Sequence, residues 1–292
     1  MALDAVPATS PGRPARARLV ADLTPPLVVG LAIIALAIVG AFALPALSPF
    51  RAEQIDQANS LVGPSLTHPL GNDDLGRDVL VRVMVGYQIS LAVAVGSVLL
   101  ALVLGIPLGL MAGYLSGLVD NLIMRPLDVL MAFPAILLAV VVMAVLGTGT
   151  LVVVIAIGIV YTPIIARVMR ATTLTTRGEL YVESARARGA STLRIVAHHI
   201  LPNSVGPVIV QASILLGFAV LLEAALSFIG LGVRPPTPSL GLMLSTERDF
   251  MSQAPWTVVA PGFALMLLVL GFNLVGDGLR DRLDPRGRAR VR

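Results

Sequence analysis

Residues 88 to 113 have the sequence QISLAVAVGSVLLALVLGIPLGLMAG, and this apolar run decides the fold class. A helix rises about 1.5 Å per residue, so roughly 20 apolar residues cross a hydrocarbon core about 30 Å thick. The run is therefore long enough to span a membrane. Because a spanning backbone must satisfy its own hydrogen bonds, we expect a helix.

Apolar runs of similar length lie on both sides of this one. The predicted spans lie near residues 26–46, 88–113, 126–146, 151–168, 205–230 and 257–278. Hydrophobic residues make up 56% of the chain and charged residues 13%, a composition typical of integral membrane proteins. The predicted fold class is all-α, a polytopic membrane protein with six transmembrane helices in one domain over residues 25–280.

The distribution of arginine predicts the orientation of these spans. The chain has no lysine. One side of the membrane holds Arg13, Arg16, Arg18, Arg125, Arg167, Arg170, Arg177, Arg186, Arg188, Arg194, Arg280, Arg282, Arg286, Arg288, Arg290 and Arg292. The other side holds only Arg51, Arg77, Arg82, Arg234 and Arg248. The positive-inside rule then predicts that both termini are cytoplasmic. Since the arginines follow topology, we expect no nucleic-acid partner.

The two ends of the chain differ from the spans in composition. Residues 1–24 are rich in Ala, Pro and Arg, which predicts a disordered cytoplasmic lead. Residues 281–292 form a predicted cytoplasmic basic tail. The segment Ala41-Phe42-Ala43 resembles a signal-peptide cleavage site, but the length of the first apolar run favours a retained anchor.

Two long segments are predicted outside the membrane. Residues 47–87 contain an acidic cluster, and apolar residues at helical intervals from 75 to 87 predict a helix lying on the membrane surface. The second segment, residues 231–256, is rich in proline and cannot be one continuous helix.

Short connections and small residues predict how the spans pack. Gly105, Gly109 and Gly113 recur at four-residue steps, which allows close approach of a neighbouring helix. Only residues 147–150 connect the third and fourth spans. We therefore expect those spans to form an antiparallel hairpin.

The connection between the fourth and fifth spans is polar and rich in arginine. Thr176 and Glu179 have the spacing of a capping box, which predicts a short helix over residues 177–188. Gly189 stands where a left-handed C-terminal cap belongs. A second short helix would follow and end at Pro202, so that residues 177–202 form a helical hairpin.

This hairpin carries a recognisable signature. Glu183-Ser184-Ala185, Gly189 and Ile200-Leu201-Pro202 resemble the EAA motif of permease subunits of ATP-binding-cassette (ABC) importers. Ser184 replaces an alanine at the second position of the motif, and His199 replaces a common isoleucine. The resemblance implies that the hairpin is the coupling helix that docks into a partner ATPase. The implied coupling residues are Glu183, Ser184, Ala185, Arg186, Arg188, Gly189, Arg194 and Pro202.

Further blocks resemble one subclass of that family, the second permease subunit of dipeptide, oligopeptide and nickel importers. These blocks are residues 68–73 with 76–78, residues 226–232 with 235–236, and residues 273–281 with 283–285. The resemblance implies the type I ABC importer permease fold in a bacterial cytoplasmic membrane. Its implied partners are membrane lipid, a homologous permease, two cytoplasmic ATPases, an external substrate-binding protein and a peptide or similar small solute.

The residue inventory argues against catalysis by this chain. A P-loop needs a lysine that reaches the phosphates, and the chain has none. We therefore predict that the chain is not an enzyme and holds no cofactor, and that ATP and Mg²⁺ bind the partner ATPases. The chain also has no cysteine, and the adjacent His198 and His199 point in different directions, so we expect no metal site.

Individual charged residues leave alternatives open. Glu223 lies inside the fifth span, where it either lines the translocation path or makes a structural hydrogen bond. Asp128 is expected to pair with Arg125 or to cap its helix. An ion-coupled secondary transporter using Glu223 and Asp128, or a membrane scaffold without transport, are the alternative functions. The candidate docking residues for a binding protein are Asp73, Arg77, Asp78, Pro235 and Pro236.

Overall fold

The computed structural model describes residues 24–283, and this part of the chain consists of helices and connections without a named strand. The helices are α2 (Pro25–Leu47), α3 (Val79–Leu115), α4 (Gly117–Met131), α5 (Ala135–Leu146), α6 (Thr150–Arg177), α7 (Leu180–Ala187), α8 (Thr192–Ile195), α9 (Leu201–Phe228), α10 (Leu240–Glu247) and α11 (Trp256–Leu283). The predicted lead lies outside the described residues, apart from its last residue. The predicted tail also lies outside them, except that α11 continues to Leu283.

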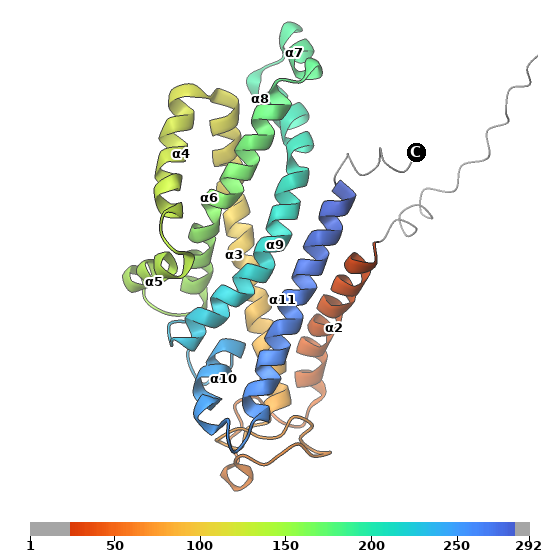
Figure 1. Ribbon diagram of the computed structural model, residues 1–292, viewed down its shortest axis with the longest axis vertical. Coiled ribbons are helices and arrows are strands. Elements are labelled where there is room, and N and C mark those ends of the chain that lie inside the picture. The colour runs from red at the N-terminus through yellow and green to blue at the C-terminus, as the bar shows by residue number, and fades with distance from the viewer. Residues whose placement is uncertain (1–23, 284–292) are drawn as a thin grey trace, which may run out of the picture.

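The long helices form a bundle with two different ends (Figure 1). The short helices α7 and α8 cap one end, and the segment between α2 and α3 lies with α10 at the other end. The start of α2 and the end of α11 point toward the α7 end. Within the described residues five helices are long and apolar enough to cross a membrane, or six if α4 and α5 together count as one span. The all-α polytopic prediction is confirmed.

Glycines on α3 determine its contact with α6. A Cβ on Gly105 would lie 2.8 Å from Cβ of Ile165, and one on Gly109 would lie 2.4 Å from the carbonyl oxygen of Ala166. These distances are below van der Waals contact, so only glycine permits this approach of the two backbones. The predicted close packing through small residues is confirmed.

The third span is not one straight helix, and this prediction was wrong. Helices α4 and α5 meet at a bend of 99°. Pro134 stands at the N-cap of α5, where its ring and missing amide hydrogen prevent α4 from continuing. Helix α5 has 12 residues, which rise about 18 Å and cannot cross the core alone. It runs crosswise to α6 in Figure 1 instead of forming a hairpin of two straight spans.

The expected surface helix over residues 75–87 is also wrong. Helix α3 starts at Val79, and Val79, Val83 and Tyr87 are buried in the bundle. Asp78 caps this start, because its carboxylate accepts a hydrogen bond from the amide of Val81 at 2.8 Å. The apolar periodicity of residues 75–87 therefore indicates the buried face of α3 and not a helix on the membrane surface.

Candidate functional site

The tip formed by α7, α8 and the turn between them, residues 180–195, is here called the knob. Gly189 adopts the left-handed conformation expected of it, with φ +78°. Its amide donates to the carbonyl of Arg186 at 3.0 Å, and the amide of Ala190 donates to the carbonyl of Ala185 at 3.1 Å. This pair of bonds is the Schellman motif, which closes α7 and fixes the turn.

The predicted capping box before the knob does not form. Thr176 lies inside α6, and its hydroxyl lies 3.2 Å from that of Ser204 on α9. Glu179 occupies the N-cap position of α7 without a side-chain cap. The first short helix therefore starts at Leu180 rather than Arg177, because α6 extends further than the apolar run.

The inner face of the knob is apolar and packed on the bundle. Val182, Ala185, Ile195 and Ile200 are almost fully buried, and the partly exposed Tyr114 of α3 packs against them. This small cluster holds the two short helices together and fixes them to the end of α3. Ala185, predicted as a coupling residue, therefore anchors the knob and is not available to a partner.

The outer face of the knob is exposed and mixed in character. The exposed residues include Leu180, Tyr181, Glu183, Ser184, Arg186, Arg188, Leu193 and Arg194. Leu180 and Leu193 are each 79% exposed. Apolar side chains rimmed by charges at a protruding tip are typical of a protein contact surface.

The knob continues into α9 without a break. We expected an extended stop at Pro202, yet residues 192–228 form one continuous helical segment. A π-helical stretch, Val196–Ile200, ends two residues before the proline, and the amide of Leu201 donates to the carbonyl of Val196. The wider turn accommodates Pro202. In a regular α-helix the ring of a proline clashes with the carbonyl of the residue four positions earlier. The second short helix of the knob and α9 are therefore parts of one continuous helical segment.

Arg177 ties the base of the knob to the end of α3. One of its guanidinium nitrogens donates to the carbonyl of Tyr114 and to the hydroxyl of Ser116, each at 2.6 Å. A cation is favourable at the C-terminus of a helix, where carbonyls lack partners. Sequence reasoning assigned Arg177 only to topology. Its position as the first residue of the predicted hairpin was the available signal.

Two ion pairs attach α4 to α6. Asp128 pairs with Arg167 at 2.6 Å and not with Arg125, which corrects the expected partner. Asp120 accepts two hydrogen bonds from Arg170, each at 2.5 Å. Helix α4 has no fully buried residue, so its contact with α6 is peripheral and includes these two ion pairs.

Glu223 is fully buried where α9, α3 and the start of α10 meet. One carboxylate oxygen accepts from the hydroxyl of Ser90 on α3, and the other accepts from that of Ser227 on α9, both at 2.8 Å. The hydroxyls satisfy the carboxyl inside the bundle, as the structural alternative for Glu223 requires.

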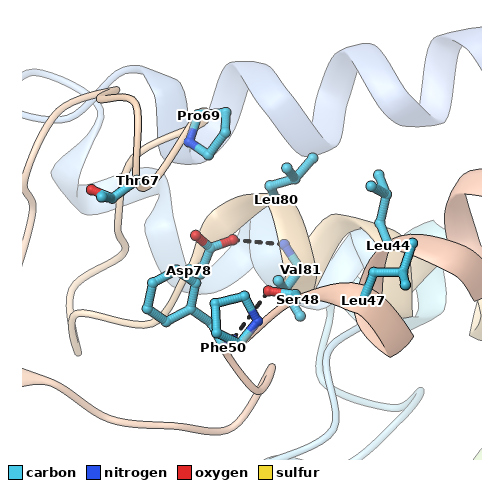
Figure 2. A pocket seen from close by; sticks show the side chains of 10 residues that line it. Leu44, Leu47, Ser48, Phe50, Thr67, Pro69, Asp78, Leu80 and Val81 are labelled. Carbon is cyan, nitrogen blue, oxygen red and sulfur yellow. Dashed lines mark hydrogen bonds between the residues drawn. The ribbon is translucent and has the colours of Figure 1, made fainter.

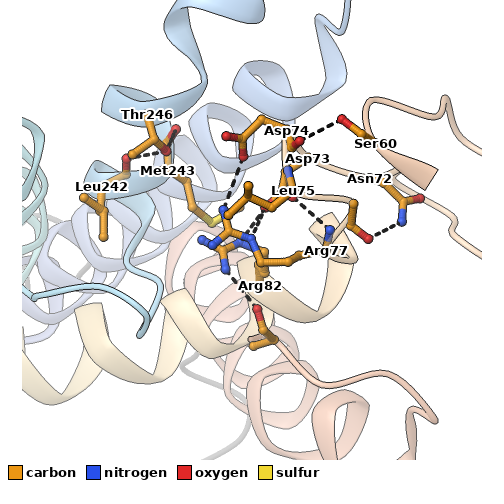
Figure 3. A network of polar contacts seen from close by, with 12 residues as sticks. Ser60, Asn72, Asp73, Asp74, Leu75, Arg77, Arg82, Leu242, Met243 and Thr246 are labelled. Carbon is orange, nitrogen blue, oxygen red and sulfur yellow. Dashed lines mark hydrogen bonds and ion pairs between the residues drawn. The ribbon is translucent and has the colours of Figure 1, made fainter. Parts of the chain in front are cut away.

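A second polar network lies at the opposite end of the molecule (Figure 3). The carboxylate of Asp73 accepts from the backbone amides of Leu75 and Arg77 and pairs with the side chains of Arg77 at 2.6 Å and Arg82 at 3.2 Å. Arg82 also donates to the carbonyl of Ala52 at 2.9 Å. The network thus joins the segment before α3 to α3 itself.

The network changes the interpretation of the candidate docking residues. Asp73 and Asp78 are only 1% and 4% exposed, so they hold the segment together and present almost no surface. Pro235 and Pro236, in contrast, are exposed. Sequence reasoning gave Arg82 no role, although a lone charge inside the apolar stretch VLVRVMV is the signal for a buried partner.

An apolar pocket of about 360 Å³ lies between the end of α2 and the start of α3 (Figure 2). Its polar groups are already engaged: the hydroxyl of Ser48 accepts from the amide of Phe50, and Asp78 binds Val81 and His68. The pocket therefore lacks free groups to recognise a polar solute.

Comparison with known proteins agrees with this architecture. A family model described as "binding-protein-dependent transport system inner membrane component" matches residues 105–289. The dipeptide transport system permease protein DppC of Alkalihalophilus pseudofirmus is 45% identical over 89% of this chain and 85% of its own length. The glutathione transport system permease protein GsiD of Shigella flexneri is 51% identical over 82% of this chain and 80% of its own.

Two solved structures share the fold. An inward-facing structure of the MetNI methionine ABC transporter superposes with a TM-score of 0.53 at 19% identity, covering 70% of this chain and 96% of that one. A crystal structure of an amino acid ABC transporter with histidines gives a TM-score of 0.52 at 14% identity, with 71% and 93% covered. At these identities the likeness concerns the fold alone.

Proposed function

Because the chain belongs to the family of binding-protein-dependent transport system inner membrane components, the membrane permeases of ABC importers, we propose that it forms half of a translocation path for short peptides. The second half would be a homologous permease. Relatives named for dipeptide and glutathione transport, both short peptides, support the cargo class.

One observation supports a coupling role above all others. The knob has an inner face fixed to the bundle and an outer face that exposes leucines, a tyrosine and arginines to solvent. A surface of this kind fits the groove of a cytoplasmic ATPase. This orientation makes the α7 end cytoplasmic and agrees with the arginine distribution.

The proposed coupling mechanism depends on the continuous helix that connects the knob to the bundle. Closure of the ATPases on ATP would displace the knob, and the uninterrupted helix from residue 192 to residue 228 would carry the motion into the bundle. ATP and Mg²⁺ would bind only the ATPases, since this chain lacks the lysine of a P-loop. An external binding protein would deliver peptide at the opposite end, with the exposed Pro235 and Pro236 within its docking surface.

Reversal of one knob charge tests this function. In proteoliposomes containing the chain, its partner permease, both ATPases and the binding protein, we expect Glu183→Arg to lower ATP-driven peptide uptake at least about tenfold, equivalent to about 1.4 kcal/mol. The knob would still fold, because Glu183 is exposed and makes no ion pair within the described residues.

The matched control is Arg248→Glu at the other end, where Arg248 is exposed and pairs with its exposed neighbour Asp249. This variant should keep wild-type uptake in the same assay with saturating binding protein. Normal uptake by Glu183→Arg would contradict the coupling role. Uptake without ATPases, driven by an ion gradient, would contradict the proposed function as a whole.

A further inference from the structure

Glu247 is a buried acid at the end of α10, and neither the fold nor the proposed transport cycle explains it. Its side chain is 1% exposed, and within the described residues its Oε2 atom has no hydrogen-bond donor. The carboxylate oxygens of Asp73, Asp74 and Glu247 lie within 4.8 Å of one another. Three acids therefore converge where α10 meets the segment before α3.

The donors around this cluster do not reach Glu247. Asp73 takes two backbone amides and both guanidinium groups, and Asp74 receives only a long contact from Arg77 at 3.4 Å. Arg82 is directed to Asp73 and to a backbone carbonyl. Figure 3 shows Met243 and Thr246 of α10 beside these groups.

The charges around the cluster do not balance. Asp73, Asp74 and Glu247 provide three negative charges against the two positive charges of Arg77 and Arg82. The next residues along the chain, Arg248 and Asp249, are exposed and pair with each other. Glu223, at the other end of α10, is already bound by Ser90 and Ser227. One positive charge is therefore missing between Glu247 and its neighbours.

A divalent cation is a poor candidate for that charge. The Asp73 carboxylate already accepts three hydrogen bonds and pairs with Arg82, so two guanidinium groups adjoin the site and would repel a divalent cation. A proton needs no further ligands and makes the cluster neutral. Asp74, whose side chain is 28% exposed, gives this proton a route to water.

We propose that Glu247 carries one proton toward the neighbouring carboxylate of Asp74, and that this proton clamps α10 to the segment before α3. When the proton leaves to bulk water, two carboxylates face each other without a donor, and α10 separates from the segment. The clamp is thus a pH-sensitive contact at the end of the molecule opposite the knob. It does not depend on the identity of the cargo.

The direction of the pH dependence follows from the chemistry of the site. Burial, followed by the charges of Asp74 and Asp73, raises the pKa of Glu247 to about 8. In the separated state the pKa returns to about 4.3. A raised acid pKa means that the closed form binds more protons, so the clamp weakens as pH rises from about 4.3 to about 8 and changes little above that.

A buried reporter can measure this opening, because the chain has no other cysteine. Met243, on the same helix, is 2% exposed, so Met243→Cys reacts with a maleimide only when α10 opens. The measured quantity is the labelling rate of Met243→Cys divided by that of Met243→Cys with Glu247→Gln. The division cancels the pH dependence of the thiol itself. The protein is the full-length chain with its partner subunits in lipid nanodiscs.

We expect this ratio to rise about tenfold per pH unit between pH 6 and 7 and to level off above about pH 8. A ratio that stays constant over this range would overturn the proposal. Chelator should leave labelling at pH 6 unchanged. If EDTA instead increased labelling and Ca²⁺ reversed the increase, a bound cation would replace the proton on Glu247 as the explanation, and the proposal would be overturned.

Two further measurements guard against a variant that misfolds. Asp74→Asn removes the carboxylate that faces Glu247. The labelling rate of Met243→Cys in this background should therefore depend less on pH. Deuterium exchange of the amides of residues 240–247, in the chain without an added cysteine, should show the pH-dependent opening and lose it in Glu247→Gln. Retention of the pH dependence in both variants would overturn the proposal.

Discussion

The network around Asp73 and the knob, at opposite ends of the bundle, differ in the burial and pairing of their charged side chains. Around Asp73 the charges are buried and paired with one another inside the chain. On the knob Glu183, Arg186 and Arg194 are exposed, and no ion pair joins them to another described residue. The first arrangement holds the chain together, and the second leaves the charged side chains in contact with solvent, as the proposed coupling surface requires.

This difference shows why a charged motif needs its tertiary context. The acidic cluster near Asp73 and the arginines of the hairpin have similar polarity in the sequence. Burial decides between them, because removing one member of a buried pair leaves an unpaired charge in a medium of low dielectric. An exposed charge loses little when its partner is changed.

The largest effect is expected at the buried end. Asp73→Asn leaves Arg77 and Arg82 without their shared carboxylate, and the side chains of these arginines are only 11% and 4% exposed. We expect a loss of about 3–5 kcal/mol in the stability of the folded chain. Thermal denaturation of the purified transporter measures it.

Asp249→Asn is the matched control, since the side chain of Asp249 is 80% exposed. Its effect should stay within about 0.5 kcal/mol. If both variants melted at the same temperature, the contrast between a structural network and a solvated pair would be wrong.

The second-largest effect is expected at Gly189, in the turn of the knob. Proline cannot adopt the φ of +78° at Gly189, and Gly189→Pro also removes the amide that donates to Arg186. The turn must rearrange at a cost of about 1–2 kcal/mol or more. Peptide uptake should fall at least about tenfold while the chain still inserts and assembles with its partner permease.

Asparagine tolerates the left-handed region better than most residues, so Gly189→Asn should keep most of the uptake. The two variants together separate the shape of the turn from the loss of glycine itself. Equal uptake by both would show that the turn geometry does not matter for coupling.

The smallest effect is expected on α4. The pair of Asp128 with Arg167 is about half exposed on both sides, so Asp128→Asn should change stability by only about 0–1 kcal/mol. Uptake should remain ATP-driven and unchanged. Loss of uptake in this variant would favour the alternative in which Asp128 carries a coupling ion.

Much of the fold could be predicted because hydrophobic length and periodicity are local properties. Five of the spans, the left-handed turn at Gly189 and the close contact of α3 with α6 followed from apolar runs and small residues. The family followed from four motifs in order, and the comparisons confirm it.

The errors lie where two local rules compete. Pro134 breaks the helix in the middle of the third predicted span, whereas Pro202, just before the fifth predicted span, does not interrupt the helix. The π-helical stretch before Pro202 contains Val196 and Ile200, which pack with Val182 and Ala185 of α7 and with Leu110 and Tyr114 of α3. Such a contact has no signal in the local sequence.

The sequence by itself determined that this is a membrane-spanning helical protein, which surface is rich in arginine and to which family the chain belongs. These properties depend on composition, run length and motif order, which need no knowledge of contacts. Only the tertiary structure decided which charged side chains are buried and which are exposed. It pairs Asp128 with Arg167, and within the described residues it leaves Oε2 of Glu247 without a hydrogen-bond partner. The reason is that the energy of a charge depends on its surroundings, and residues far apart in the chain provide those surroundings.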